Sequence, residues 1–172
     1  MPIIATAGES RSYTPAPEGT HHAVCVDVID LGQLPNSFKP GTTQHKVNIV
    51  WQIDERRDDG KRFLVYKRYT LSLNEKANLR HDLESWRGKP FTREEEMGFD
   101  VETVKGANCL VNIQHKPSAD KSRTYANVVS VMPLIKGMAK LVPEAYERHQ
   151  EETQQAETPT DDAPVELDEI PF

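Results

Sequence analysis

Hydrophobic and polar side chains alternate along residues 46–54 and again along residues 62–71. Successive side chains of a β-strand point to opposite faces, so this period of two predicts two strands, each with one core face and one wetter face. The segment between them has no hydrophobic residue, and its Asp59-Gly60 pair supplies the positive φ that a hairpin reversal needs. The pattern therefore predicts a long β-hairpin near the centre of the chain.

Three further strands are predicted from β-branched, alternating segments at residues 20–31, 108–115 and 124–132. Residues 32–43 are rich in proline and glycine and predict a long loop between the first two strands. With Phe38 and Lys39, this loop fits either a functional segment or a plain connector.

One main helix is predicted between the third and fourth strands. Leu79, Leu83 and Trp86 recur at helical spacing, which gives this helix one apolar face. The sequence Ser72-Leu73-Asn74-Glu75 has the spacing of a capping box and predicts that the helix starts there, with Ser72 or Asn74 as N-cap.

Five strands with a helix between the third and the fourth are the order of an OB-fold, an all-β, five-stranded Greek-key barrel. Other five-stranded barrels give a similar order, and the helix, placed to close one end of the barrel, favours the OB-fold. We expect an irregular lead-in over residues 1–15, the OB-fold domain over residues 16–135, and a disordered acidic tail over residues 136–172.

Charge is distributed unevenly along the chain. Residues 1–140 carry 20 basic and 17 acidic side chains, a net charge of +3, whereas residues 141–172 carry one arginine and 10 acidic side chains, a net charge of −9. A mildly basic body with an acidic tail is typical of a nucleic-acid-binding domain joined to an interaction segment. No apolar run is long enough to span a membrane.

The sequence offers no positive support for catalysis. None of the six histidines pairs with cysteine at zinc spacing, and no phosphate loop or nucleophile elbow occurs. Cys25 and Cys109 lie in strand-like apolar patterns, so we expect reduced core residues of a cytosolic protein, with a disulfide or metal pair as the alternative. We therefore expect a protein that is not an enzyme and needs no cofactor or metal.

Basic side chains neutralise phosphates, and aromatic rings stack on bases of any sequence. Tyr66 and Arg68 share the outward face of their strand with Arg62 and are the strongest candidates. The full set of candidate DNA-binding residues is Lys46, Trp51, Arg62, Tyr66, Lys67, Arg68, Tyr69, Arg123 and Tyr125.

Two of the aromatic candidates also fit the core. Trp51 shares its face with three aliphatic residues of the same strand, which favours burial over stacking, and Tyr69 raises the same question. Tyr125 is in phase with Arg123, which favours exposure, but the phase continues into Val129 and Val131. A bulge would decide between the two faces.

The last six residues, Leu167-Asp168-Glu169-Ile170-Pro171-Phe172, resemble the acidic C-terminal tip of bacterial single-stranded DNA-binding proteins. In this resemblance Ile170 and Phe172 form an apolar anchor, stiffened by Pro171, and the acidic residues steer it to basic pockets. The resemblance implies that the tip docks on replication or repair proteins through Asp168, Glu169, Ile170, Pro171 and Phe172.

The body is similar to bacteriophage-type single-stranded DNA-binding proteins over about two-thirds of the chain. The segments that carry this similarity are residues 15–20, 46–53, 76–80, 83–88 and 125–128. The resemblance implies an OB-fold that coats single-stranded DNA during phage replication or recombination, in the cytoplasm of a bacterial host. A protein-interaction adaptor and an RNA-binding OB module are the alternatives, and pairing of an edge strand between chains would give a homo-oligomer.

Overall fold

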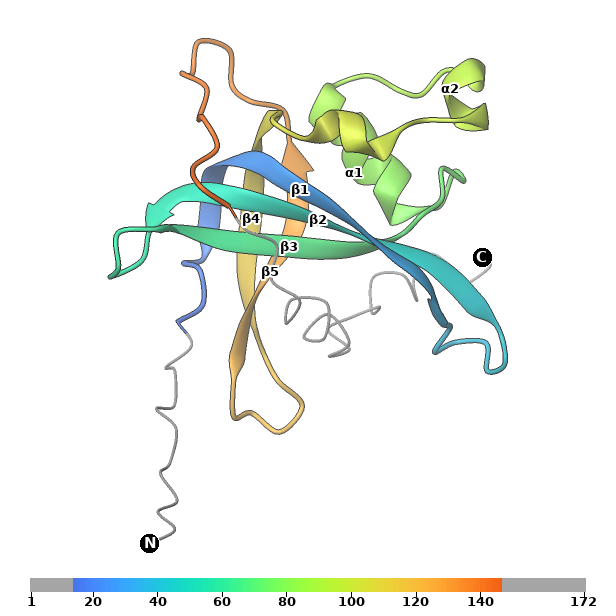
Figure 1. The fold of residues 1–172 in the computed structure, drawn as a ribbon, viewed down its shortest axis with the longest axis horizontal. Coiled ribbons are helices and arrows are strands. Elements are labelled where there is room, and N and C mark those ends of the chain that lie inside the picture. Colours follow the sequence, from blue (N-terminus) through green and yellow to red (C-terminus); the bar gives the residue numbers. More distant parts are fainter. Residues whose placement is uncertain (1–13, 147–172) are drawn as a thin grey trace, which may run out of the picture.

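A five-stranded antiparallel sheet forms the body of the protein in the computed structural model, which describes residues 14–146 (Figure 1). The order across the sheet is β3-β2-β1-β4-β5, so β1 lies in the centre and pairs with both β2 and β4. The strands are β1 (Gly19–Pro35), β2 (Thr43–Arg56), β3 (Arg62–Thr70), β4 (Asn108–Pro117) and β5 (Thr124–Met132). The protein is therefore mostly β, as the alternating patterns predict.

β2 and β3 form the predicted hairpin. Gly60 has φ +82°, and the turn closes through the Arg57 N–H, which donates to the Lys61 carbonyl at 2.8 Å. Glycine adopts this left-handed conformation without steric cost, which explains why the reversal occurs there.

The prediction of a long loop over residues 32–43 is wrong. β1 and β2 continue to pair through most of it, from Gly32 opposite Lys46 to Pro35 opposite Thr43, and leave a short connection at residues 36–42. A register shift before Gly32 absorbs the break in the alternation. Pairing across the sheet therefore overrides the local proline and glycine signals, and the two strands extend as a projecting hairpin (Figure 1).

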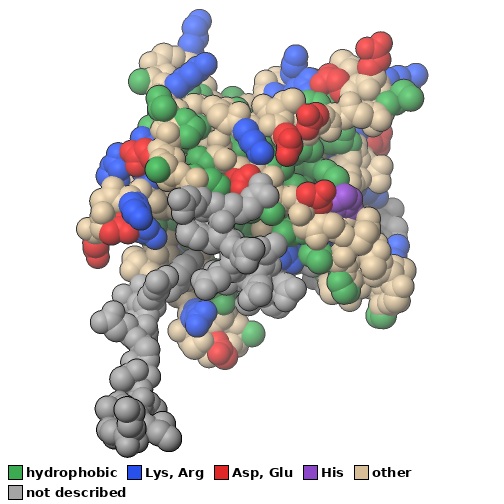
Figure 2. Space-filling view, in the orientation of Figure 1, with side chains coloured by type: hydrophobic (Ala, Val, Ile, Leu, Met, Phe, Trp, Pro, Cys, Tyr) green, Lys and Arg blue, Asp and Glu red, His purple; other side chains and the backbone are tan. Residues whose placement is uncertain are grey.

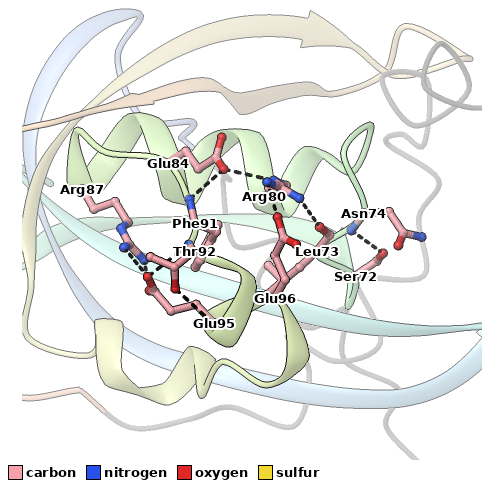
Figure 3. Close-up of polar contacts among 10 residues, drawn as sticks. All are labelled: Ser72, Leu73, Asn74, Arg80, Glu84, Arg87, Phe91, Thr92, Glu95 and Glu96. Carbon is pink, nitrogen blue, oxygen red and sulfur yellow. Dashed lines mark hydrogen bonds and ion pairs between the residues drawn. The ribbon is translucent and has the colours of Figure 1, made fainter.

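Helix α1 (Asn78–Arg87) begins later than its capping-box pattern predicts. Its N-cap is Ala77, which makes no side-chain cap, while the Ser72 hydroxyl accepts a hydrogen bond from the Asn74 N–H at 3.2 Å (Figure 3). A serine that bonds two residues ahead stabilises a turn in competition with a helix. The helix ends at Gly88, which has φ 74°.

Two arginines of α1 hold the short helix α2 (Arg93–Met97) against it (Figure 3). Arg80 binds Glu96 at 2.7 Å, and Arg87 grips both carboxylate oxygens of Glu95 at 2.5 and 3.0 Å. A 3₁₀ turn, η1 (Val101–Val104), then leads into β4. Within residues 14–146, no helix has the length and hydrophobicity needed to cross a membrane.

Helix α1 also links the two outer strands of the sheet, β3 and β5, which contact each other. The Ser85 hydroxyl donates to the Val131 carbonyl on β5 at 2.7 Å, and the Trp86 indole donates to the Asn108 carbonyl on β4 at 2.9 Å. The ring of Trp86 packs on Trp51 of β2, with 5.9 Å between their centroids. The core therefore lies between the curved sheet and this helix.

Both cysteines are free thiols buried in this core. Burial is the main cause that raises the pKa of the Cys25 thiol to about 12, and burial also raises the pKa of Cys109. Because the thiolate is the reactive form, both side chains act as small apolar residues at neutral pH, as the sequence predicts.

Candidate nucleic-acid interface

The alternation of β3 sorts its candidate residues onto two faces. Phe63, Val65 and Tyr69 are buried against the core, whereas Tyr66 and Arg68 are only partly buried on the opposite side. We call that opposite side of β2 and β3 the outward face. Its members are Lys46, Asn48, Val50 and Gln52 on β2, and Arg62, Leu64, Tyr66, Arg68 and Thr70 on β3.

On β2 the outward face is not wet, which corrects the prediction. Lys46, Asn48 and Gln52 are at most 4% exposed, and the Lys46 ammonium donates to the Thr70 hydroxyl at 2.8 Å. The Gln52 amide likewise exchanges hydrogen bonds with the Glu144 backbone, at 2.9 and 3.1 Å. The accessible part of the outward face is therefore made by β3, where Leu64 is 38% exposed.

Trp51 and Tyr69 belong to the core. Burial is the alternative that the sequence favours for Trp51, because Trp51 shares its face with aliphatic residues of the same strand. Trp51 is 0% and Tyr69 1% exposed, so a base cannot stack on either ring without disrupting the core. Lys67 shares the inward phase of Tyr69, and its side chain is largely buried. Three of the candidate residues thus support the fold beneath the outward face.

Lys67 and Tyr69 converge on a buried carboxylate of α1. The Lys67 ammonium lies 2.8 Å from Asp82 Oδ2, and the Tyr69 hydroxyl donates to the same oxygen at 2.6 Å. Burial, followed by the charge of Asp82, holds the pKa of Tyr69 well above its usual value. The cluster satisfies a buried charge and fixes α1 against β3.

A bulge decides the orientation of β5. Ile113 of β4 pairs with Val128 and Asn112 pairs with Ser130, so Val129 is the extra residue and is 43% exposed. The phase of Tyr125 therefore points outward, and Tyr125 is partly exposed. Arg123 and Tyr125 lie on the β4–β5 hairpin, however, and not on the β2–β3 outward face.

The segment after β5 returns across the sheet, which differs from the predicted domain end at residue 135. We call residues 141–146 the arm. Asn108 holds Leu141 by two hydrogen bonds, at 2.7 and 3.1 Å, and Gln52 holds Glu144 in the same reciprocal way, at 2.9 and 3.1 Å. Val24 lies between Asn108 and Gln52 in the strand register and is 0% exposed. The arm therefore covers one end of the outward face.

Glu144 joins two arginines at that end. Arg56 approaches both of its carboxylate oxygens, at 2.6 and 3.1 Å, and Arg62 Nε lies 3.4 Å from one of them. Arg62 also donates to the Val142 carbonyl at 2.8 Å. The Arg56 guanidinium is the main cause that holds the pKa of Glu144 below its usual value.

Sequence reasoning missed Arg56, Gln52 and Glu144 as parts of this surface. The signal for Arg56 is the hairpin register, which places Arg56 directly opposite Arg62. Figure 2 shows basic and acidic side chains side by side at the end that carries the β2–β3 turn, where Arg57 also pairs with Asp59. The predicted docking tip, residues 168–172, lies outside the described residues.

Neither a scan against protein-family models nor a search of curated proteins finds a match to this chain. The function of this protein is therefore inferred from its outward face and from the sequence resemblance.

We predict that Tyr69→Phe lowers the free energy of unfolding by about 1.5–3 kcal/mol at neutral pH, because it removes a buried hydrogen bond to a charged group. Because folding raises the pKa of Tyr69, the neutral hydroxyl stabilises the folded state. This stabilisation is fully present below the pKa of about 10 that tyrosine has in the unfolded chain, and it is lost as the pH rises through the pKa of Tyr69 in the folded protein. The difference between the two proteins should therefore narrow in alkali. Urea unfolding from pH 7 to 11 measures both effects.

The matched control is Tyr125→Phe, which alters a partly exposed tyrosine on β5 and should stay within about 0.5 kcal/mol of the wild type. Equal stability of Tyr69→Phe and wild type at pH 7 would contradict the structural role of the cluster.

Proposed function

We propose that this protein binds single-stranded DNA with little regard to sequence, and that it acts in phage or prophage replication or recombination by coating exposed strands. The observation that carries the proposal is the row Arg62, Tyr66 and Arg68, at alternating positions on the outward side of β3. Cationic groups on either side of a ring can follow a phosphate backbone while the ring stacks on a base.

The finer fold that we propose is an OB-fold Greek-key barrel. The strand order supports it, because β1 pairs with both β2 and β4 while β3 and β5 contact each other. The position of α1, bonded to strands on both sides of that contact, also supports it. OB-folds bind oligonucleotides on the face of their second and third strands, which is the outward face here.

The proposed mode of binding involves no chemical step. Arg62 and Arg68 would neutralise phosphates, and Tyr66 would contribute stacking worth roughly 1–3 kcal/mol per base. Leu64, which is 38% exposed between Arg62 and Tyr66, adds an apolar contact for a base or sugar. Direct reading of base edges is not needed, which is why the binding would tolerate any sequence.

We predict that Tyr66→Ala and Arg68→Ala each weaken binding to oligo-dT without unfolding the protein. For Tyr66→Ala, which removes a stacking contact, the loss of affinity should be roughly 5- to 100-fold. Fluorescence anisotropy with labelled oligo-dT, oligo-rU and duplex DNA, at two salt concentrations, measures the effect. Arg68→Ala should also flatten the dependence of affinity on salt, because it removes one phosphate contact.

Arg93→Ala, which removes an exposed charge of α2, is the matched control and should leave the affinity unchanged. No binding of oligo-dT by the wild type at low salt would leave the adaptor function, and a clear preference for oligo-rU would move the function to RNA. Unchanged affinity in both outward-face variants would show that the wrong face was chosen.

The docking tip is a separate part of the proposal, supported by the sequence alone. We predict that Phe172→Ala abolishes most of the binding to replication or repair proteins, because a single buried aromatic anchor usually carries most of the energy of such a contact. A pull-down from bacterial lysate compares wild type, Phe172→Ala and the tail control Val165→Ala. Recovery of the same proteins by all three would rule out docking through the tip.

A further inference from the structure

Arg56 and Arg62 lie directly opposite each other across the β2–β3 hairpin. Like charges at opposed positions of a strand pair destabilise it, unless an anion lies between them. Glu144 provides that anion, with its carboxylate held by both nitrogens of the Arg56 fork and approached by Arg62 Nε. The hairpin therefore presents a two-arginine anion site that the protein fills with its own side chain.

The arrangement around Glu144 has the geometry of phosphate recognition. A planar guanidinium binds carboxylates and phosphates through the same parallel pair of N–H donors. A phosphodiester carries one negative charge, as does the Glu144 carboxylate, so one can replace the other between the arginines without a change in local charge. The site also lies on the outward face, in line with Tyr66 and Arg68 on β3.

The arm that delivers Glu144 is attached by polar contacts and buries little of itself. Val142 is 74% exposed, and the arm is held through the side chains of Asn108, Gln52, Arg56 and Arg62. At its end the Tyr146 hydroxyl donates to Asp27 Oδ2 at 3.1 Å. A segment with few buried apolar contacts opens at a low free-energy cost and without disturbing the core. The arm can therefore leave the sheet while the five strands remain folded.

We propose that Arg56 and Arg62 form a phosphate subsite of the DNA-binding surface, and that residues 141–146 are a latch that occupies it until a strand displaces Glu144. This inference rests on the proposed function and adds two residues, Arg56 and Gln52, to the surface. When the arm leaves, the Gln52 amide regains one donor and one acceptor that can bond to a nucleotide.

The latch makes binding depend on the length of the strand. A single phosphate bound at the two arginines replaces the negative charge that Glu144 already supplies, so this exchange contributes little binding free energy. A strand that also reaches Tyr66 and Arg68 adds stacking and a further phosphate contact, and these drive the exchange. Short oligonucleotides should therefore gain more than long ones when the latch is removed.

The test is Glu144→Gln, which keeps the side-chain size and removes the charge. We expect affinity for oligo-dT to rise roughly 1.5- to 5-fold, as for the loss of an exposed ion pair that competes with the ligand. The slope of log affinity against log salt should become steeper by up to about 1, because phosphates are no longer exchanged for a carboxylate. Glu94→Gln, an exposed acidic residue of α2, is the control with the same change in net charge.

Hydrogen exchange gives a second readout in the wild-type protein. The Leu141 and Glu144 amides donate to Asn108 and Gln52, so both should exchange faster when oligo-dT is bound. Amides of β4 should keep their protection, which separates release of the arm from general unfolding.

The outcomes separate the latch from the function. If wild type binds oligo-dT and Glu144→Gln binds no better than Glu94→Gln, the function stands and the latch is wrong. Unchanged protection of Leu141 and Glu144 in the bound state would also overturn the latch. If the wild type does not bind oligo-dT, the function is rejected and the latch with it, and binding by Glu144→Gln alone would show that a strand does not displace Glu144.

Discussion

The orientation of the candidate surface depends on the hydrogen bonds that the buried carboxylate of Asp82 accepts. It lies on α1 and accepts hydrogen bonds from Lys67 and Tyr69, the two polar side chains that β3 turns inward. A buried charge is tolerated only when its hydrogen bonds are made, so helix and strand must keep this register. Because side chains alternate along a strand, fixing Lys67 and Tyr69 inward fixes Tyr66 and Arg68 outward.

The outward face has two parts with different partners. Near the turn, the arm crosses the sheet and places Glu144 between Arg56 and Arg62, while further along β3 the face carries Tyr66 and Arg68. The same surface thus combines an anion site that is filled by the chain itself with a partly buried ring and a partly buried cation further along β3. Competition between an internal carboxylate and a phosphate would make occupancy respond to salt and to strand length.

Local patterns predicted the strands and not the contacts between distant segments. β5 has the predicted bounds and β3 differs by one residue, because the period-two alternation that predicts a strand depends only on the residues of that strand. The extension of β1 and β2, the late start of α1 and the return of the arm depend on pairing partners that no window of sequence contains. The opposition of Arg56 and Arg62 becomes visible only once the hairpin register is known.

Photo-crosslinking tests the central claim, that the outward face of β3 holds single-stranded DNA, most directly. Oligo-dT carrying 5-bromodeoxyuridine would be irradiated with the full-length protein, and the crosslinked residues identified by mass spectrometry. Crosslinks are expected at Tyr66 and its neighbours on the outward side of β3, and an excess of unlabelled oligo-dT should suppress them. Crosslinks confined to other elements, such as the α2 segment or the tip of the β4–β5 hairpin, would contradict this claim.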